Sequence, residues 1–462
     1  MKKKIKKNII QEEKKEISNI FNKFRKRDFS GTTGQAMKNS SYQLAQSLIF
    51  KFGSLLFTII IARMLLPELF GLYSLALATI ILFAGFSDLG IGSALMTYGA
   101  KMLGKNNPKK AKEYIKKLLK WKLWLVFISS GILLASAYFI AEFYYAKPIF
   151  YALLVGGLYL PLVSLIGFFD QMFKAHENFK IPMLKEAIFQ VIRSIFVPLA
   201  IFLFLKNGIS NQGLIVVMLL VLTFSYFIVF LFLVKKAKKE IEFLKVKAGK
   251  LNSREIKDLK KFILPLSAMA IAGLFFGYID TLMLGHFVSS KFIAYYGVAF
   301  SLVAGISVIL GFMSSGLMPI FAKKSGKALE TIFRKTRNLT LLISIIAGVF
   351  VYLVAKPIIK LAYGFQYLPA TSVLKWFSIM IILLPVIGLY VSYFTTQKKT
   401  KELAWLILGA AILNIIFNWF GITYGLRING EIGGVLGAVG ATILSRIIYL
   451  GGLIIFRRRR KK

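Results

Sequence analysis

Residues 214–234 read LIVVMLLVLTFSYFIVFLFLV, and this stretch, which contains no charged residue, decides the fold. A helix needs about 20 mostly apolar residues to cross the roughly 30 Å hydrocarbon core of a bilayer. A helix suits this environment because it satisfies its own backbone hydrogen bonds, which lipid cannot do. Residues 72–86 and 124–140 have the same character. The sequence therefore predicts an integral membrane protein built of helices.

About twelve such spans are expected along the chain, which makes the fold class all-α. The basic segments around them suggest a cytoplasmic tail (1–40), a first lobe of six spans (41–234), a basic cytoplasmic linker (235–261), a second lobe of six spans (262–456) and a short basic tail (457–462). The spans are expected near residues 41–64, 72–97, 123–145, 148–170, 185–205, 212–234, 262–288, 297–321, 339–362, 371–396, 402–423 and 432–456.

The charge of the chain has two possible meanings. Lys and Arg number 61 against 19 Asp and Glu, so the net charge is +42, although 57% of the residues are hydrophobic. A nucleic-acid-binding protein would carry this excess on a water-soluble surface. Here the positive charges lie between the spans, in alternate loops: 105–122, 174–185, 235–261, 323–337 and 398–401. Basic loops stay on the cytoplasmic side. We therefore expect a multi-pass protein of the cell membrane with both termini in the cytoplasm and no nucleic-acid partner.

The residues that most enzymes and metal sites require are scarce. The sequence has no Cys, and its two histidines, His176 and His286, lie in different loops. Gly326 and Lys327 are followed by Ala328, so the chain has no phosphate-binding loop of the type that ATPases use. We expect no enzyme activity, no cofactor and no metal, and any active transport would depend on an ion or substrate gradient.

A weak internal repeat supports two similar halves. Residues 68–73 (ELFGLY) follow the first span, and residues 291–296 (KFIAYY) follow the seventh at the same relative place. Six spans separate the two segments, so the halves have the same orientation. Parallel repeats of this kind occur in one class of secondary transporters.

Ionisable residues inside the spans are the main functional candidates, because burying a charge in lipid is costly. They are Lys51, Asp88, Arg193, Asp280 and Arg446. All except Asp280 are expected roughly 12–15 Å from the cytoplasmic boundary at about 1.5 Å per residue. Lys51 is predicted to face Asp88 on the next span. This arrangement indicates either a structural ion pair or a cavity rich in cations.

A cavity with excess positive charge favours an anionic substrate. Arginine in particular binds phosphate through two parallel hydrogen bonds. Asn414 and Asn418 share a helix face at a spacing of four residues, where they could bind sugar hydroxyls or form bonds between helices.

Four segments resemble the polysaccharide (oligosaccharide) flippases of the multidrug/oligosaccharidyl-lipid/polysaccharide exporter superfamily. They are residues 62–73 (ARMLLPELFGLY), 86–95 (FSDLGIGSAL), 278–285 (YIDTLMLG) and 434–442 (GVLGAVGAT). The similarity extends over about 41–456. It implies two six-helix lobes around a central cavity and transport by alternating access.

The resemblance also implies a cargo. Flippases of this kind move polyprenyl-linked saccharides, which carry phosphate or pyrophosphate, to the outer leaflet. The phosphate is then expected near Lys51, Arg193 and Arg446, with membrane lipids and glycosyltransferases as partners. Two alternatives stay open: an exporter of drugs or metabolites coupled to cations through Asp88 or Asp280, and a membrane scaffold for glycosyltransferases.

Overall fold

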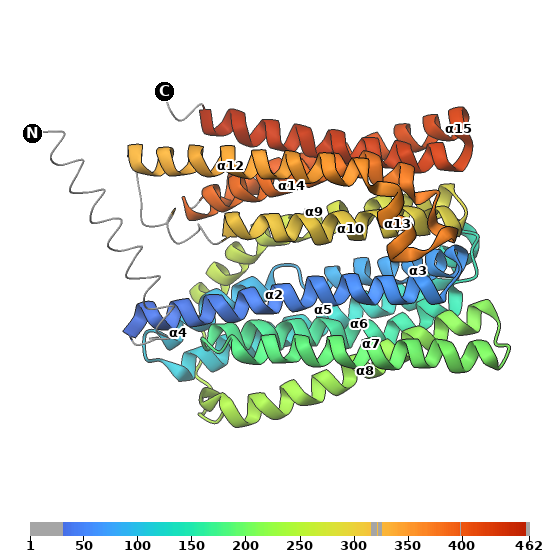
Figure 1. The fold of residues 1–462 in the computed structure, drawn as a ribbon. Coiled ribbons are helices and arrows are strands. Elements are labelled where there is room, and N and C mark those ends of the chain that lie inside the picture. The colour runs from blue at the N-terminus through green and yellow to red at the C-terminus, as the bar shows by residue number, and fades with distance from the viewer. Residues whose placement is uncertain (1–30, 316–320, 322–325, 398, 459–462) are drawn as a thin grey trace, which may run out of the picture.

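The protein is a bundle of long helices arranged in two lobes (Figure 1). The computed structural model describes residues 31–315, 321, 326–397 and 399–458, and none of them lies in a strand. Most of the predicted N-terminal tail and residues 459–462 lie outside the described residues. The predicted all-α fold is confirmed.

The first lobe contains helices α2 to α8. Their bounds are α2 Gly31–Met64, α3 Pro67–Phe86, α4 Ile91–Leu103, α5 Pro108–Tyr138 with a π-helical turn Phe139–Tyr144, α6 Phe150–Ala175, α7 Lys180–Lys206 and α8 Asn211–Glu240.

The second lobe follows a 3₁₀ turn, Glu242–Leu244. Its elements are α9 Ser253–Phe287, α10 Ser290–Ser315, α12 Gly326–Leu353, α13 Ala355–Tyr363, a 3₁₀ turn Phe365–Tyr367, α14 Ala370–Thr396 and α15 Thr400–Arg458.

Helix α15 is two spans rather than one. Eleven helices in the described part of the chain are long and apolar enough to cross a membrane, and the last of these has 58 residues. Its helical geometry breaks at Asn429 and Gly430, where Gly430 has a φ of 56°. The halves fold back on each other and pack closely: a side chain at Gly421 would meet the carbonyl oxygen of Gly437 at 2.6 Å. With the two halves of α15 counted separately, the described residues contain twelve candidate spans, which is the number expected.

The second span is interrupted, although the sequence predicts a continuous helix over 72–97. Helix α3 ends at Phe86, and α4 begins at Ile91 after a turn. Leu89 and Gly90 both have positive φ, 40° and 78°, and a helix cannot continue through residues in that region. The turn is short, Ser87 to Gly90, and apolar residues flank it on both sides, so hydropathy averaged over a span does not reveal the break.

The lobes are held together at the end opposite the termini. Gly71 of α3 lies so close to α10 that a side chain there would approach the Ser290 carbonyl oxygen to 1.8 Å. Arg63 donates hydrogen bonds to the carbonyl oxygens of Leu361 and Ala362, the latter at 2.7 Å. These carbonyls end α13, where a cation is favourable. We call the contacts of Arg63 and Gly71 with the second lobe the distal latch.

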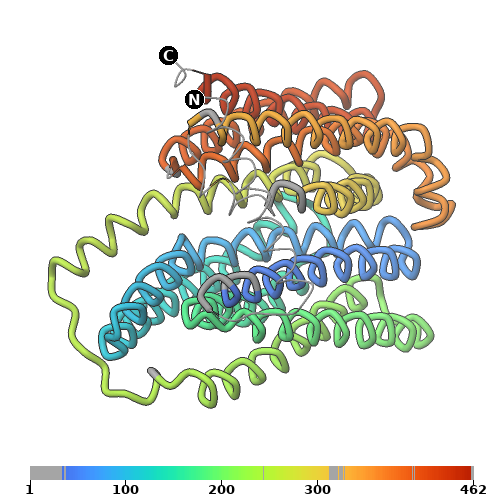
Figure 2. The backbone as a smooth tube through the Cα atoms, turned by 60° about the vertical axis from the view of Figure 1, so that its left-hand side comes forward, coloured from blue at the N-terminus to red at the C-terminus, as the bar shows by residue number. Residues whose placement is uncertain are grey.

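The terminal end is joined mainly through α9. Lys110 of α5 pairs with Glu255 at 2.5 Å, and Ser267 donates to the Leu89 carbonyl oxygen at 2.8 Å. Farther along, Ala272 and Phe276 belong to the core of the second lobe. Figure 2 shows the chain leaving α8 in one lobe and entering α9, which runs to the other. Helix α9 therefore connects the lobes.

Candidate functional site

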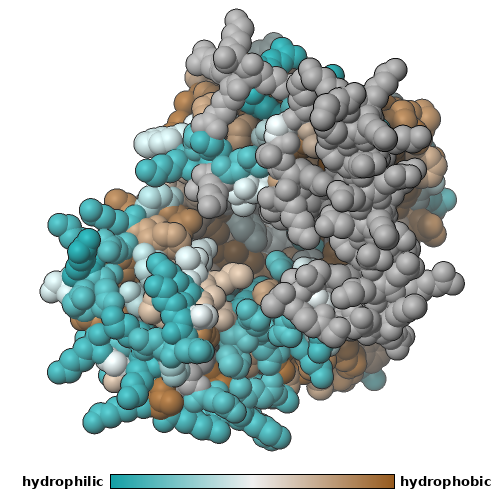
Figure 3. All heavy atoms as spheres, turned by 90° about the vertical axis from the view of Figure 1, so that its left-hand side faces the viewer, coloured by the Kyte–Doolittle hydropathy of each residue, from teal (hydrophilic) through white to brown (hydrophobic). Residues whose placement is uncertain are grey.

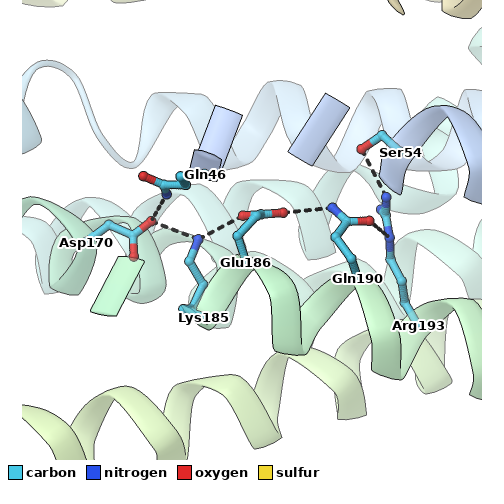
Figure 4. Close-up of polar contacts among 7 residues, drawn as sticks. All are labelled: Gln46, Ser54, Asp170, Lys185, Glu186, Gln190 and Arg193. Carbon is cyan, nitrogen blue, oxygen red and sulfur yellow. Dashed lines mark hydrogen bonds and ion pairs between the residues drawn. The ribbon is translucent and has the colours of Figure 1, made fainter. Parts of the chain in front are cut away.

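A chain of buried and half-buried polar residues runs along α7 in the first lobe (Figure 4). Lys185 pairs with Asp170 of α6 at 2.8 Å and with Glu186 at 3.1 Å. Gln190 donates to Glu186 at 2.7 Å, and Arg193 donates to Gln190 at 2.9 Å. We call these five residues the α7 network. Its two acidic and two basic groups balance, which lowers the cost of placing charge inside the membrane.

Helix α2 closes the network from the other side. Gln46 donates to Asp170 at 3.5 Å, and Arg193 donates to Ser54 at 3.0 Å. The guanidinium carbon of Arg193 also lies 4.4 Å from the centre of the Phe57 ring, a distance at which cation–π attraction is effective. Gly53 allows the close approach, because a side chain there would meet Gln190 at 2.5 Å.

Lys51 lies one helical turn before Ser54 and is half-buried. Its ammonium group lies 5.4 Å from the centre of the Phe50 ring. Within the described ranges it has no ion pair and no hydrogen bond. Leu55, which shares its helix face, approaches Gly305 of α10. Lys51 therefore lies on the side of α2 that faces the second lobe.

The predicted pairing of Lys51 with Asp88 is wrong. Asp88 instead pairs with Lys122 of α5 at 2.7 Å. The prediction used only the depth of the two residues in the membrane, and depth does not fix the direction in which a side chain points. Lys122, which the sequence analysis assigned to a cytoplasmic loop, is 1% exposed within α5. Asp88 therefore forms a structural ion pair, one of the two alternatives predicted for it, but with Lys122 instead of Lys51.

A second polar cluster surrounds Asp280 in the other lobe. Its carboxylate accepts hydrogen bonds from Tyr296 at 2.5 Å, Asn418 at 2.5 Å and Thr442 at 2.6 Å. The residues come from α9, α10 and both halves of α15. Asn414 donates to Thr442 at 3.3 Å. We call these five residues the Asp280 cluster.

The Asp280 cluster has unused oxygen atoms. The side-chain oxygens of Asn414 and Asn418 are buried without a hydrogen-bond partner. A carboxylate, two amide oxygens and a hydroxyl are ligands that hard cations prefer. Both asparagines are fully buried and donate to residues of other spans, Thr442 and Asp280, which is one of the two roles expected for them. In the described part of the chain no three His, Cys, Asp or Glu residues gather as a metal site.

Arg446 lies beside this cluster rather than beside the other predicted cations. It donates to the carbonyl oxygen of Phe276 at 3.1 Å, and its guanidinium carbon lies 3.7 Å from the centre of that ring. The structure brings Arg193 of α7 against Ser54 of α2, one turn after Lys51, and places Arg446 in the other lobe.

Sequence reasoning missed four charged residues that the fold places inside the bundle: Asp170, Glu186, Lys185 and Lys122. The first three lie at the ends of predicted spans, where charged residues are typical of loops. Glu186, Gln190 and Arg193 follow a spacing of four and then three residues, which places them on one helix face. That pattern was the available signal.

Comparisons with known proteins agree with this architecture. The family described as polysaccharide biosynthesis protein matches residues 36–325, and the MatE family matches residues 265–420. No curated protein matches the chain. A multidrug resistance MATE family transporter of the MOP superfamily, in an inward-facing conformation, is similar with a TM-score of 0.72 and 15% identity, over 90% of this chain and 96% of that one.

Two further structures extend the comparison. The lipid II flippase MurJ in an inward closed conformation has a TM-score of 0.67 and 16% identity, over 88% of this chain and 86% of that one. An outward-facing MATE family transporter gives 0.54 at 15% identity, over 94% of this chain and 98% of that one. These likenesses show a shared fold. The matches to the two families confirm the relationship that the four motifs suggest. Because the first family matches more than half of the sequence, the chain belongs to the polysaccharide biosynthesis protein family.

Proposed function

We propose that the protein moves a polyprenyl-(pyro)phosphate-linked oligosaccharide from the cytoplasmic to the outer leaflet by alternating access. Its role would be the assembly of surface polysaccharide or glycan. Membership of a polysaccharide biosynthesis family and the fold shared with MOP transporters support this proposal.

The position of Lys51 is the observation on which the proposal mainly rests. An unpaired cation within a membrane span is costly unless it meets water or an anionic ligand. Lys51 faces the other lobe, half-buried, with no anionic partner among the described residues. A phosphate group would supply that partner through charge-assisted hydrogen bonds. Arg193 of α7, which bonds to Ser54 one turn after Lys51, would exchange that bond for one to the substrate.

Arg446 would have a different part in this scheme. It lies in the second lobe beside Asp280, so it would reach the phosphate only when the lobes move. Asn414 and Asn418 would likewise contact sugar only in another conformation, because they are fully buried here.

The direction of transport follows from the charged end of the molecule. We place this end, which carries the described termini, in the cytoplasm because basic segments stay on that side. Figure 3 shows hydrophilic residues gathered over much of this face. The distal latch closes the opposite end. The higher TM-score with the inward-facing relative than with the outward-facing one supports an inward-facing state. Such a state would receive substrate from the cytoplasmic leaflet of the cell membrane, where glycosyltransferases would supply it.

The Asp280 cluster favours a second candidate, a cation-coupled exporter of drugs or metabolites. Its oxygen atoms could bind the coupling cation. The same cluster is compatible with a flippase that uses a cation gradient, so the two candidates differ in cargo and not in this site.

The cargo can be tested in a strain that lacks the protein. We expect lipid-linked oligosaccharide to accumulate in the inner leaflet and to be exported again when the gene is restored. Unchanged lipid-linked sugars together with new drug sensitivity would favour the exporter. A purely structural scaffold would lower glycan synthesis without accumulation of the lipid-linked intermediate.

A further inference from the structure

An apolar groove opens beside the break between α3 and α4. It has a volume of about 370 Å³, and its lining includes Leu89, Trp121, Trp124, Lys260, Leu264 and Ser267. These residues come from the break itself, from α5 and from α9. The groove therefore lies where the first lobe meets the helix that connects the two lobes.

The groove presents exposed apolar side chains within membrane spans. Leu264 is 74% exposed and Trp124 is 59% exposed, and both lie in membrane spans. Apart from Lys260 and Ser267, the residues named above are apolar or aromatic, and Ser267 already donates to the Leu89 carbonyl oxygen. Such a surface suits a hydrocarbon chain and offers few hydrogen-bonding groups to a sugar.

Positive charge borders the groove at one end. Lys260 is exposed on its rim, and Lys117 holds its ammonium group 5.8 Å from the centre of the Trp121 ring. Tryptophan side chains commonly mark the level of the lipid headgroups. An anionic headgroup would therefore find lysines at the level where the apolar surface begins.

The ion pair inside the wall does not oppose this charge. Asp88, next to Leu89, is neutralised by Lys122 at 2.7 Å. The groove thus combines an apolar floor with a positive rim.

We propose that this groove binds the polyprenyl chain of the lipid-linked substrate, with its phosphate beside Lys260. The inference rests on the proposed function and adds to it a place for the lipid while the sugar enters between the lobes. Bulk phospholipid is the competing occupant.

Site-directed photo-crosslinking can test the groove, because the native chain has no Cys. Leu264→Cys would carry a benzophenone maleimide in the groove. Ile455→Cys is the matched control, since it is 57% exposed and lies near the same end of the bundle. The purified full chain would be placed in phosphatidylcholine vesicles with polyprenyl pyrophosphate bearing a radiolabelled N-acetylhexosamine.

We expect labelling at Leu264→Cys well above that at Ile455→Cys, with competition by unlabelled polyprenyl pyrophosphate and not by phosphatidylglycerol. Adding Lys260→Gln should lower the labelling about fivefold, the effect of one interfacial lysine on an anionic lipid. Equal labelling at both positions, or equal competition by phosphatidylglycerol, would overturn the proposal.

A translocation assay on the same vesicles tests the groove and the proposed function separately. If the wild type moves the labelled lipid but the groove is not labelled, the groove proposal fails and the proposed function stands. If the wild type moves no labelled lipid, the proposed function fails and the groove loses its stated role.

Discussion

Lys185 should be essential to the stability of the first lobe. It is buried between Asp170 and Glu186, and all three side chains are less than 12% exposed. Lys185→Met keeps the length and the apolar stem of the side chain and removes only the charge. Asp170 would then retain only a long hydrogen bond from Gln46, and Glu186 only its bond from Gln190.

The expected loss follows from the two charges left behind. Removing one partner of a buried pair costs about 3–5 kcal/mol, because the remaining charge is uncompensated. A loss of about 4 kcal/mol is roughly a thousandfold in the unfolding equilibrium. Neutralising the whole group should recover most of this loss, because an uncharged set needs no partner. The matched variant is Asp170→Asn, Lys185→Met and Glu186→Gln together.

The assay is equilibrium unfolding in mixed micelles of mild detergent and dodecyl sulfate. Lys206→Met is the control, because Lys206 lies exposed at the end of the same helix and should change stability by no more than about 0.5 kcal/mol. A free energy of unfolding for Lys185→Met that equals the control would refute the reasoning. So would a triple variant as unstable as the single one.

Three other predictions concern the latch, the last hairpin and the second cluster. Arg63→Gln should weaken the distal latch by about 1.5–3 kcal/mol, the value of a charge-assisted hydrogen bond. It should also speed the labelling of Ser290→Cys by an impermeant maleimide added outside. An unchanged labelling rate would contradict the latch. Gly425→Ala should cost about 1–3 kcal/mol of stability, because a side chain there would lie 2.1 Å from a facing carbonyl oxygen. Gly440→Ala is the control, because a side chain at Gly440 meets nothing within 4 Å. Equal effects of the two variants in thermal unfolding would contradict the close packing. Asp280→Asn should leave the fold intact and reduce the response of transport in vesicles to an imposed Na⁺ or H⁺ gradient; an unaltered response would exclude Asp280 as the coupling group.

The sequence was sufficient to predict the number of membrane spans and the all-α class of the fold. Each apolar stretch meets the length that the bilayer requires, so the span count depends on composition alone. The repeated segments at 68–73 and 291–296 also predicted two similar halves. In the structure Gly71 of the first segment lies against Ser290, directly before the second segment.

Side-chain partners could not be predicted in the same way. A span of known length still has an unknown rotation, and Asp88 pairs with Lys122 instead of Lys51. Lysine is a good helix former, so α5 begins at Pro108, within the predicted basic loop, and carries Lys122 into the bundle. The α7 network depends on three helices that meet only in the folded protein.

Translocation by purified protein tests the central claim most directly. Vesicles would contain a fluorescent polyprenyl-pyrophosphate-linked sugar in one leaflet, and an impermeant quencher would report its movement to the other. Lys51→Arg should remain active, whereas Lys51→Ala should slow translocation about tenfold or more, the loss expected for a charge-assisted bond to phosphate. Translocation by Lys51→Ala at the wild-type rate, or none by the wild type, would contradict the account.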